Sequence, residues 1–255
     1  MTSICVPSFF ITKGTIVACI RNPESSTELT NYQISLNEAS NRIVIITLDI
    51  ENQNSIEAAC DDIKSQFHRI DLLLNVAGIL GDGGITTPGP ERALNKITRQ
   101  WLEKTFAVNI FGPVMIIKEL ESLLVQKRIR NTEISTDNKT LASRPPSIVV
   151  NFSARVGSIS DNELGGWYSY RMSKSALNQA TRTMAIELKR SNVWVISYHP
   201  GTTNTDLSKP FQKNVKDGSL FPADFTSNQL LNILDAMDTK HSGGFYDWSG
   251  QAISF

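Results

Sequence analysis

The chain has 255 residues, of which 40% are hydrophobic and 20% charged, with 25 basic residues against 25 acidic ones. A chain of this length and composition can bury a large core, which excludes intrinsic disorder. The formal net charge of zero provides no long-range attraction for polyanions, which argues against nucleic acid or an anionic membrane as the main partner. We therefore expect a small-molecule ligand.

The cysteine content favours a reducing compartment, and the hydropathy predicts no membrane segment. The three cysteines, Cys5, Cys19 and Cys60, are too few and too scattered for a disulfide framework or a zinc site, and we expect them to be buried as small apolar residues. No stretch approaches the roughly 20 apolar residues that cross a bilayer. The apolar residues 1–11 lack a basic leader and a small-residue cleavage site. The sequence thus predicts a cytoplasmic protein without a membrane segment.

Short β-rich runs alternate with longer helical patterns along the chain. Such alternation is typical of strands joined through helices into a parallel sheet. The runs are apolar at successive positions, so we expect helices on both faces of every strand. This predicts an α/β fold with a Rossmann-like, doubly wound parallel sheet. The runs are residues 15–20, 43–48, 72–74, 148–152 and 193–198.

Apolar residues at helical spacing predict three core-packed helices between these strands. One begins behind Asn54 as N-cap and extends to Phe67, one extends from Phe106 to Leu124, and one carries a stripe from Met172 to Leu188. Residues 128–146 are polar and without period, which predicts an exposed loop insertion. We expect a single domain over residues 1–255, with an atypical N-terminus at residues 1–14.

The sharpest chemical feature is Tyr170 followed by Lys174, at the start of a predicted helix. Positions four apart share a helix face, which places the ammonium beside the phenol. A nearby positive charge lowers the pKa of a phenol from about 10 toward the range of a general acid or base. Taken alone the pair is weak evidence, because both residue types are common on solvated helix faces.

Other polar residues follow the predicted strands in an order that favours a common site. Asn75 and Gly78 follow one strand, Asn151 and Ser153 end another, and His199, Pro200 and Gly201 end a third. In an open parallel sheet, ligands bind in the crevice beyond the carboxyl ends of the strands. We therefore expect these segments to converge with the Tyr170 helix.

With these motifs in this order, the sequence resembles the short-chain dehydrogenase/reductase family over residues 8 to 250. The stretch from Ser153 to Gln179 is most similar to the carbonyl-reductase and C-factor-like branch. The resemblance implies an NAD(P)-dependent oxidoreductase of a small carbonyl compound or alcohol. Tyr170 would be the general acid or base, Lys174 would lower its pKa and hold the ribose hydroxyls, and Asn109 would fix a water that relays protons. It also implies a homodimer or homotetramer assembled through the Phe106 and Tyr170 helices.

The resemblance also implies a set of cofactor-binding positions. Arg21, where an arginine suits a 2′-phosphate, favours NADP over NAD. Asp49 would cap the adenine, although an Asp after a strand is often only a turn former. Gly78 has an equally good structural explanation as a turn residue. The remaining positions are Asn75, Ala77, Tyr170, Lys174, Pro200, Gly201, Thr203 and Thr205.

Chemistry of other kinds has no support in the sequence. The three histidines, His68, His199 and His241, have no partner at metal-ligand spacing, so we expect no metal. A Gly-x-Ser-x-Gly elbow is absent, so a hydrolase would have no nucleophile to name.

The sequence departs from the family pattern at the third catalytic hydroxyl. The family has two adjacent serines where this chain has Ser153 and Ala154. Three alternatives are open: Ser153 takes the place of the second serine, Ser158 on the following turn reaches the site, or the third catalytic hydroxyl is absent. We expect Ser153, and the loss of one such donor typically costs about 10² to 10³ in rate.

A second departure concerns the glycine-rich turn that receives the pyrophosphate in the family. The only early glycine, Gly14, precedes the 15–20 strand, and residues 1–14 are too short for a parallel strand and its crossover. Three explanations stay open: Ile4 to Ile11 fills the place of the missing strand, the 15–20 and 72–74 strands close up, or the sequence is a truncated product. The absent turn favours an alternative function, a truncated, non-catalytic binding or signalling protein, whereas intact Asn109, Tyr170 and Lys174 favour the enzyme.

Overall fold

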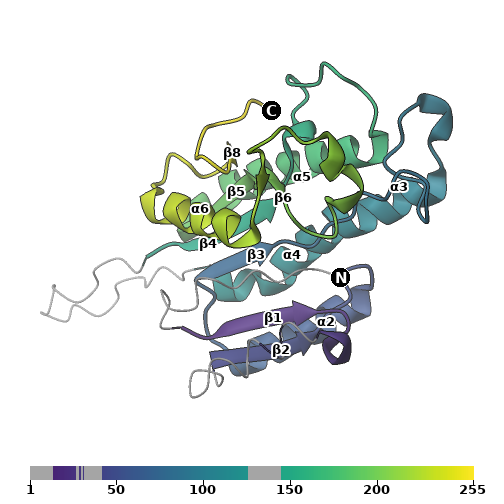
Figure 1. Ribbon diagram of the computed structural model, residues 1–255. Coiled ribbons are helices and arrows are strands. Elements are labelled where there is room, and N and C mark those ends of the chain that lie inside the picture. The colour runs from purple at the N-terminus through teal and green to yellow at the C-terminus, as the bar shows by residue number, and fades with distance from the viewer. Residues whose placement is uncertain (1–13, 27–28, 30, 32–41, 126–144) are drawn as a thin grey trace, which may run out of the picture.

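The computed structural model describes residues 14–26, 29, 31, 42–125 and 145–255 (Figure 1). The strands are β1 (Ile16–Ile20), β2 (Ile43–Thr47), β3 (Leu72–Asn75), β4 (Ser147–Phe152), β5 (Val193–His199), β6 (Thr202–Thr203), β7 (Leu220–Phe221) and β8 (Phe245–Asp247). The helices are α2 (Gln53–Gln66), α3 (Arg99–Phe106), a π-helical turn (Ala107–Phe111), α4 (Gly112–Leu124), α5 (Tyr168–Glu187) and α6 (Ala223–Ala236).

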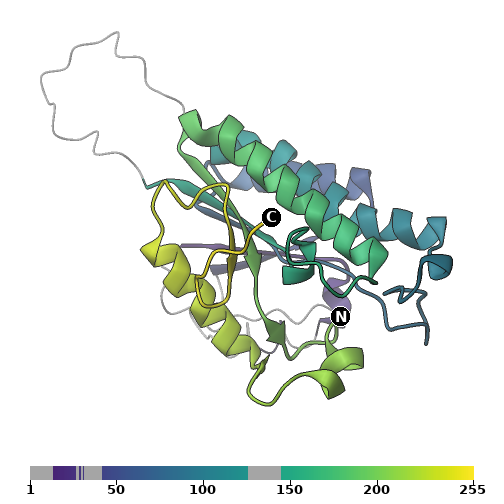
Figure 2. The ribbon, with the colours of Figure 1, turned by 90° about the horizontal axis from the view of Figure 1, so that it is seen from above.

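All strand pairs in these ladders are parallel, and helices lie on both sides of the main sheet. That sheet has the order β3-β4-β5-β8, while β1 and β2 form a separate pair and β6 and β7 a short one. Seen from above, α2, α4 and α5 lie together on one side and α6 on the other (Figure 2). The predicted Rossmann-like α/β fold is thereby confirmed, because parallel neighbours require such crossovers.

The core lies between the main sheet and these helices. Val149, Val193 and Val195 are completely buried against α4 and α5, with Leu124 in the same cluster. On the opposite face, Ile196, Tyr198 and other residues of β4 and β5 pack against Leu230 and its neighbours on α6. Burial of apolar side chains on both faces holds the carboxyl ends of β4 and β5 in place.

The strands β1 and β3 do not close up, so that explanation of the missing glycine-rich unit is wrong. Within the described residues, β1 is hydrogen-bonded only to β2, and β3 only to β4. The two sheets are joined through helices instead, because Ile46 packs in one cluster with Ile56 of α2 and Ile116 of α4. Residues 4–11, which another explanation places in this gap, lie outside the described residues.

The expected burial of every strand on both faces is wrong for β3. Leu72, Leu74 and Val76, which alternate onto one face, are exposed by 37%, 41% and 45% of their surface. Leu73 and Asn75 on the other face are partly buried and buried. The apolar pattern did not reveal this because α6 packs over β4, β5 and β8, in a cluster that includes no residue of β3.

The exposed face of β3 leads to a solubility prediction. Replacing Leu74 with Lys should change the free energy of unfolding by no more than about 0.5 kcal/mol, because Leu74 lies at the surface. The same change at Leu73, which packs into the core, should cost several kcal/mol. Leu74→Lys should also reduce binding of a hydrophobic dye and self-association, measured by fluorescence and light scattering. Equal destabilisation by both variants would contradict the exposed face.

Two predicted helices differ from expectation in detail. The N-cap of α2 is Asn52, whose side chain accepts a hydrogen bond from the Ser55 amide, whereas Asn54 lies inside the helix. On α5, Met172 is 40% exposed, and the buried face is offset from the predicted stripe. That face carries polar side chains, so apolar spacing alone predicted its centre incorrectly, although Met184 and Leu188 of the stripe do pack in the core. The buried residues of α5 are Ser169, Tyr170, Ser173, Lys174, Leu177, Asn178, Thr181 and Ala185.

Other expectations have mixed outcomes. Cys60 is buried as expected but Cys19 is exposed, and Cys5 lies outside the described residues. Of the predicted insertion 128–146, only its last two residues are described, and of residues 1–14 only Gly14. Within the described ranges, the helices are too short or too polar to cross a membrane.

Candidate active site

Tyr170 and Lys174 lie one turn apart on the buried face of α5, as their spacing predicts. The Lys174 Nζ is 5.7 Å from the centroid of the Tyr170 ring. The two residues are only 7% and 3% exposed. They are thus placed side by side, in a setting with little access for water.

The Lys174 amine is fixed at the carboxyl end of the main sheet. Its Nζ donates a hydrogen bond of 2.6 Å to the carbonyl oxygen of Phe152, the last residue of β4. Burial lowers the pKa of Lys174 to about 8, because the charged ammonium loses its hydration. The charged form of this amine is therefore less favoured near neutral pH than that of an exposed lysine.

The predicted lowering of the Tyr170 pKa is not seen in this structure. Burial raises the pKa of Tyr170 above its ordinary value, because a phenolate would be poorly solvated there. The amine 5.7 Å from the ring does not reverse this, and its own charge is disfavoured by the same burial. The prediction was wrong because sequence spacing shows which groups are neighbours on a helix, whereas the burial that raises the pKa is set by tertiary packing.

Asn109 connects the turn after β3 with α5. It lies in the π-helical turn between α3 and α4, a local widening of the helix often found at functional sites. Its Oδ1 accepts from the Ile79 amide at 2.8 Å, and its Nδ2 donates to the Ile79 carbonyl at 2.9 Å and to the Ser173 hydroxyl at 3.0 Å. Both donors of the side chain are used in this way.

Gly78 lies directly against these groups. A Cβ at this position would be 3.4 Å from Asn109 Oδ1 and 3.5 Å from Lys174 Nζ. A larger side chain would fill the space beside the amine. The structure therefore brings Gly78 together with Asn109, Tyr170 and Lys174, and the neighbouring Ala77 lies partly buried in the same turn.

Asn75 belongs to a row of buried side chains linked by hydrogen bonds, of which the sequence indicated only Asn75 and Asn151. Its Nδ2 donates to Asn151 Oδ1 at 2.8 Å, directly across the β3–β4 register. Asn151 Nδ2 in turn donates to the Thr181 hydroxyl of α5 at 2.9 Å. These hydrogen bonds connect β3 and β4 to α5, the helix that carries Tyr170. The role of Thr181 was missed, because nothing in the sequence shows which helix faces Asn151.

The choice between Ser153 and Ser158 is informed by their contacts. Ser158 donates to the carbonyl of Ser254 at 2.5 Å and accepts from the Asp161 amide, so it secures the C-terminal segment. The Ser153 hydroxyl is buried and has no hydrogen-bond partner in the described part of the chain. The same holds for Nδ1 of His199 at the end of the adjacent strand. Both atoms have hydrogen-bonding capacity free for a ligand.

The segment after β5 is shaped by Gly201 and fastened to α6. Gly201 has φ +72°, and a Cβ there would be 2.7 Å from the Phe221 ring, so only glycine fits without strain. Thr203 shares a hydrogen bond of 3.0 Å with Thr226 of α6, and the Thr205 hydroxyl donates to the Thr203 carbonyl. Together with Pro200, these residues form a turn whose threonine hydroxyls bond within the protein.

Arg21 and Asp49 lie at the ends of β1 and β2, apart from the Tyr170 group. Arg21 is 3.9 Å from a carboxylate oxygen of Glu51, and 61% of its side chain is exposed. Asp49 accepts from the Glu51 amide at 3.0 Å, and its own amide donates to Ser55 at 2.9 Å. These contacts support the turn-forming interpretation of Asp49. They leave Arg21 accessible beside one acidic neighbour.

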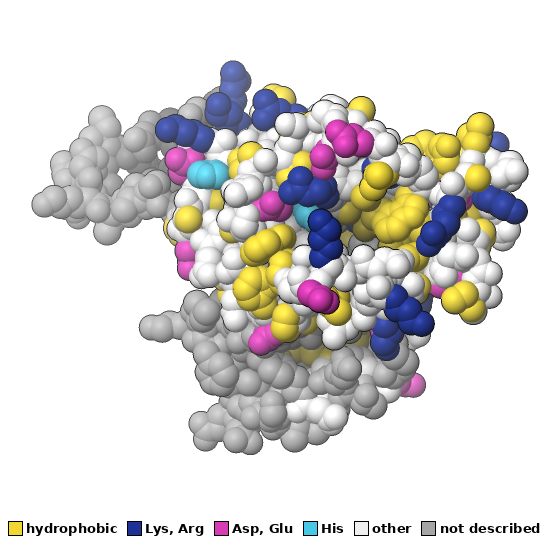
Figure 3. Space-filling model, turned by 45° about the horizontal axis from the view of Figure 1, so that its top comes forward, with side chains coloured by type: hydrophobic (Ala, Val, Ile, Leu, Met, Phe, Trp, Pro, Cys, Tyr) yellow, Lys and Arg dark blue, Asp and Glu magenta, His cyan; other side chains and the backbone are white. Residues whose placement is uncertain are grey.

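Aromatic residues next to Tyr170 were missed in the sequence. The Trp167 ring centroid is 6.3 Å from that of Tyr170 and 5.4 Å from that of Phe211, in the turn Lys209–Asn214. Trp167 adopts φ 53°, which is rare for a bulky residue. On the face shown in Figure 3, hydrophobic side chains gather in a recess bordered by Lys and Arg. The Trp167 ring thus gives the Tyr170 ring an aromatic neighbour.

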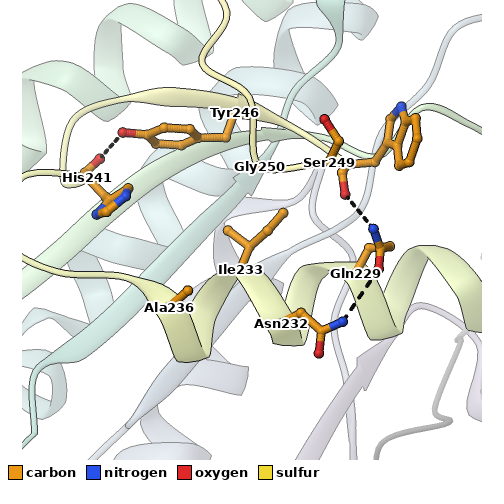
Figure 4. Close-up of a pocket in the computed structure, with 9 residues that line it drawn as sticks. Gln229, Asn232, Ile233, Ala236, His241, Tyr246, Ser249 and Gly250 are labelled. Atoms are coloured by element: carbon orange, nitrogen blue, oxygen red, sulfur yellow. Dashed lines mark hydrogen bonds between the residues drawn. The ribbon is translucent and has the colours of Figure 1, made fainter.

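A separate cavity of about 240 Å³ lies between α6 and the segment after β8 (Figure 4). Ile233 and Gln229 of α6 line one side, and Tyr246 and Ser249 the other. It contains none of the predicted site residues and is smaller than the usual range for small-molecule sites. Among the described residues, no three His, Cys, Asp or Glu side chains gather as a metal site.

Comparisons with known proteins agree with this fold. A short chain dehydrogenase family model matches residues 8–216. The C-signal protein of Myxococcus xanthus is 29% identical over 184 residues, covering 72% of this chain and 92% of that protein. An uncharacterized oxidoreductase of Schizosaccharomyces pombe is 25% identical over 252 residues, covering 94% of this chain and 88% of that protein.

Solved structures show the same architecture. The carbonyl reductase Sniffer of D. melanogaster has a TM-score of 0.77 at 23% identity, covering 97% of this chain and 92% of that one. The NADPH-bound carbonyl reductase from chicken fatty liver has a TM-score of 0.75 at 22% identity, covering 94% and 88%. Because the family model spans most of the sequence, the chain belongs to the short chain dehydrogenase family.

Proposed function

We propose that the protein is an NAD(P)-dependent oxidoreductase that interconverts a small carbonyl compound and its alcohol, with Tyr170 as general acid and base. Membership of the short chain dehydrogenase family supports oxidoreductase chemistry. The observation that carries the proposal is the buried Tyr170–Lys174 pair, with the amine held at the end of β4 beside Gly78 and Asn109. A phenol with an adjacent amine is suited to proton transfer.

The residues present fit the nicotinamide and ribose end of a dinucleotide. The unpartnered Ser153 and His199 atoms and the Lys174 amine offer hydrogen-bonding groups near the ends of β4 and β5, and Gly78 presents no side chain to the amine. When bound, the cofactor would donate or accept a hydride. No glycine-rich turn is present in the sequence for the pyrophosphate, so the fit concerns one half of the cofactor.

Each residue has a role in reducing a carbonyl group. The Tyr170 hydroxyl donates its proton to the carbonyl oxygen, and in the oxidation it takes that proton back. Lys174 holds the ribose hydroxyls and, when protonated, stabilises the phenolate that remains. The Ser153 hydroxyl donates a second hydrogen bond to the substrate oxygen, where charge develops. Asn109 positions the turn of Ile79, and its Oδ1 keeps one lone pair for the relaying water.

The proposed substrate class rests on the apolar surroundings of the phenol. Trp167 and Phe211 form an aromatic wall beside Tyr170. Two of the similar structures are carbonyl reductases. An apolar aldehyde, ketone or quinone would bury its hydrocarbon part against this wall and present its oxygen to Tyr170.

Calorimetric titration with NADPH and with NADH tests the proposal. We expect both to bind and NADPH to bind more tightly, with Arg21 contacting the 2′-phosphate. Arg21→Ala should then weaken NADPH binding about tenfold, equivalent to about 1.4 kcal/mol, and leave NADH unchanged. Arg99→Ala, at a more exposed arginine on α3, is the control for loss of a surface charge.

If neither dinucleotide binds to the folded protein, the enzymatic proposal is wrong. The absent glycine-rich turn would then favour the alternative of a non-catalytic binding or signalling protein. If both dinucleotides bind but Arg21→Ala affects them equally, the general function stands and the preference for NADP does not.

A further inference from the structure

Glu91 is a buried carboxylate that the proposed chemistry does not use. It lies between β3 and α3 and is only 1% exposed. Buried carboxylates are usually paired with a cation, because removing a charge from water is costly. In the described part of the chain, Glu91 forms no ion pair with Lys, Arg or His. What compensates the burial must therefore be hydrogen bonding.

Its hydrogen bonds are directed at the first turn of α5. One carboxylate oxygen accepts from the Ser169 amide at 3.1 Å, and the other accepts from the Ser169 hydroxyl. The Glu91 carbonyl accepts from the Trp167 amide at 2.5 Å. Ser169 and Trp167 immediately surround the start of the helix, and Tyr170 is the next residue.

The start of α5 needs such an external partner. The first amides of a helix have no partners within it, and the N-cap Trp167 makes no side-chain capping bond. The helix dipole also favours a negative charge at this end. Glu91 supplies both the acceptors and the charge, from a segment about 80 residues earlier in the chain.

The loop that carries Glu91 is ordered by contacts of its own. The Asp82 carboxylate accepts from the Thr86 amide at 2.7 Å and from the Thr87 amide at 3.0 Å. The Gly83 amide donates to the Gly89 carbonyl at 2.7 Å, which closes the loop just before Glu91. The carboxylate is therefore presented from a defined position.

We propose that Glu91 is a positioning residue, which fixes the first turn of α5 and so holds the Tyr170 phenol at its distance from the Lys174 amine. This inference rests on the proposed function, because it assigns the contact a purpose in the proton transfer of Tyr170. A displacement of about 1 Å at a reacting group can cost about 10² in rate. The carboxylate itself touches neither of the reacting groups in the described contacts.

The test compares Glu91→Ala and Glu91→Gln with the exposed control Glu163→Gln. For Glu91→Ala we expect kcat with a test aldehyde to fall by about 10- to 100-fold, and KM for NADPH to change by less than about threefold. The pH at which the Tyr170-dependent rate changes should move downward, because burial raises the pKa of the phenol and a loosened first turn admits water to it. Glu91→Gln keeps the acceptor oxygen and should lie between Glu91→Ala and the wild type.

Amide hydrogen exchange of residues 168–171 provides a readout that does not depend on turnover. These amides should exchange at least about tenfold faster in Glu91→Ala, and those in the middle of α5 should not change. Wild-type exchange rates together with a wild-type pH profile in Glu91→Ala would overturn the proposal. If Glu91→Ala does not fold, the same two measurements on Glu91→Gln decide. If the wild type lacks turnover, the proposed function fails, and faster exchange would still support the contact without its catalytic purpose.

Discussion

Tyr170→Phe is expected to lower kcat by about 10³-fold or more and to leave the fold intact. The substitution removes one oxygen atom, which is the only group on this side chain that can donate a proton. The Tyr170 hydroxyl forms no hydrogen bond to a described residue, so its removal strands no partner. The Phe ring keeps the contact with Trp167. Affinity for NADPH should therefore change by less than about threefold while the chemical step is lost.

Tyr168→Phe is the matched control for this experiment. Tyr168 lies on the same helical turn, but the residue four positions later is Met172 instead of a lysine. The control should retain wild-type kcat, followed as the oxidation of NADPH with a test aldehyde or quinone. Loss of activity confined to Tyr170→Phe would support the phenol as acid. Retention of more than about a tenth of the activity would show that another group supplies the proton.

The fold was predictable where strand and helix patterns are local. Strands β4 and β5 were placed within a residue because their apolar runs are covered on both faces. The same pattern misled at β3, where Leu72 and Leu74 are exposed. Nothing in the run Leu72–Asn75 shows whether a helix covers it, since coverage depends on the remainder of the fold.

The part of the site that depends on one helix was predictable from the sequence. The contacts between distant segments were not. Tyr170 and Lys174 are neighbours because helix geometry makes them so. The contact of Glu91 with Ser169 joins residues 78 positions apart, and no local pattern indicates it. The direction of the Tyr170 pKa shift was wrong for the same reason, because burial is decided by packing.

The missing glycine-rich turn and the residues proposed for proton transfer concern different parts of the molecule. Asn109 is hydrogen-bonded to the turn after β3 and Lys174 to the last residue of β4, at the end of the main sheet. Arg21 belongs to the separate β1–β2 pair. A weakened phosphate end would therefore raise the dissociation constant of the dinucleotide without displacing the phenol. Slow turnover at high NADPH concentration would fit this arrangement better than complete inactivity.

Lys174→Met is expected to abolish most activity and to stabilise the protein at neutral pH. Burial lowers the pKa of Lys174 from 10.5 to about 8, so the folded state disfavours the ammonium. Below pH 8 this costs about 3 kcal/mol of folding free energy. Between about pH 8 and pH 10.5 the unfolded chain binds more protons than the folded one, so wild-type stability should rise with pH in that window. Methionine of similar length carries no such cost.

The expected stabilisation of Lys174→Met is reduced by the loss of one hydrogen bond. The Phe152 carbonyl loses its hydrogen bond from Nζ, which costs about 1–2 kcal/mol, so a net stabilisation of about 1–2 kcal/mol at pH 7 is expected. Chemical unfolding of both proteins at several pH values measures it, and the difference should shrink and reverse by about pH 10. Lys189→Met, at an exposed lysine after α5, should show neither effect.

A Lys174→Met protein that is less stable than wild type at pH 7, with the same pH dependence, would mean that the amine is solvated. The fall in kcat, expected to be about 10²-fold or more, would then lack its physical basis, because a solvated amine would not be held beside the phenol. A gain in stability together with a loss of rate would show that the protein gives up folding free energy to keep a buried amine next to Tyr170.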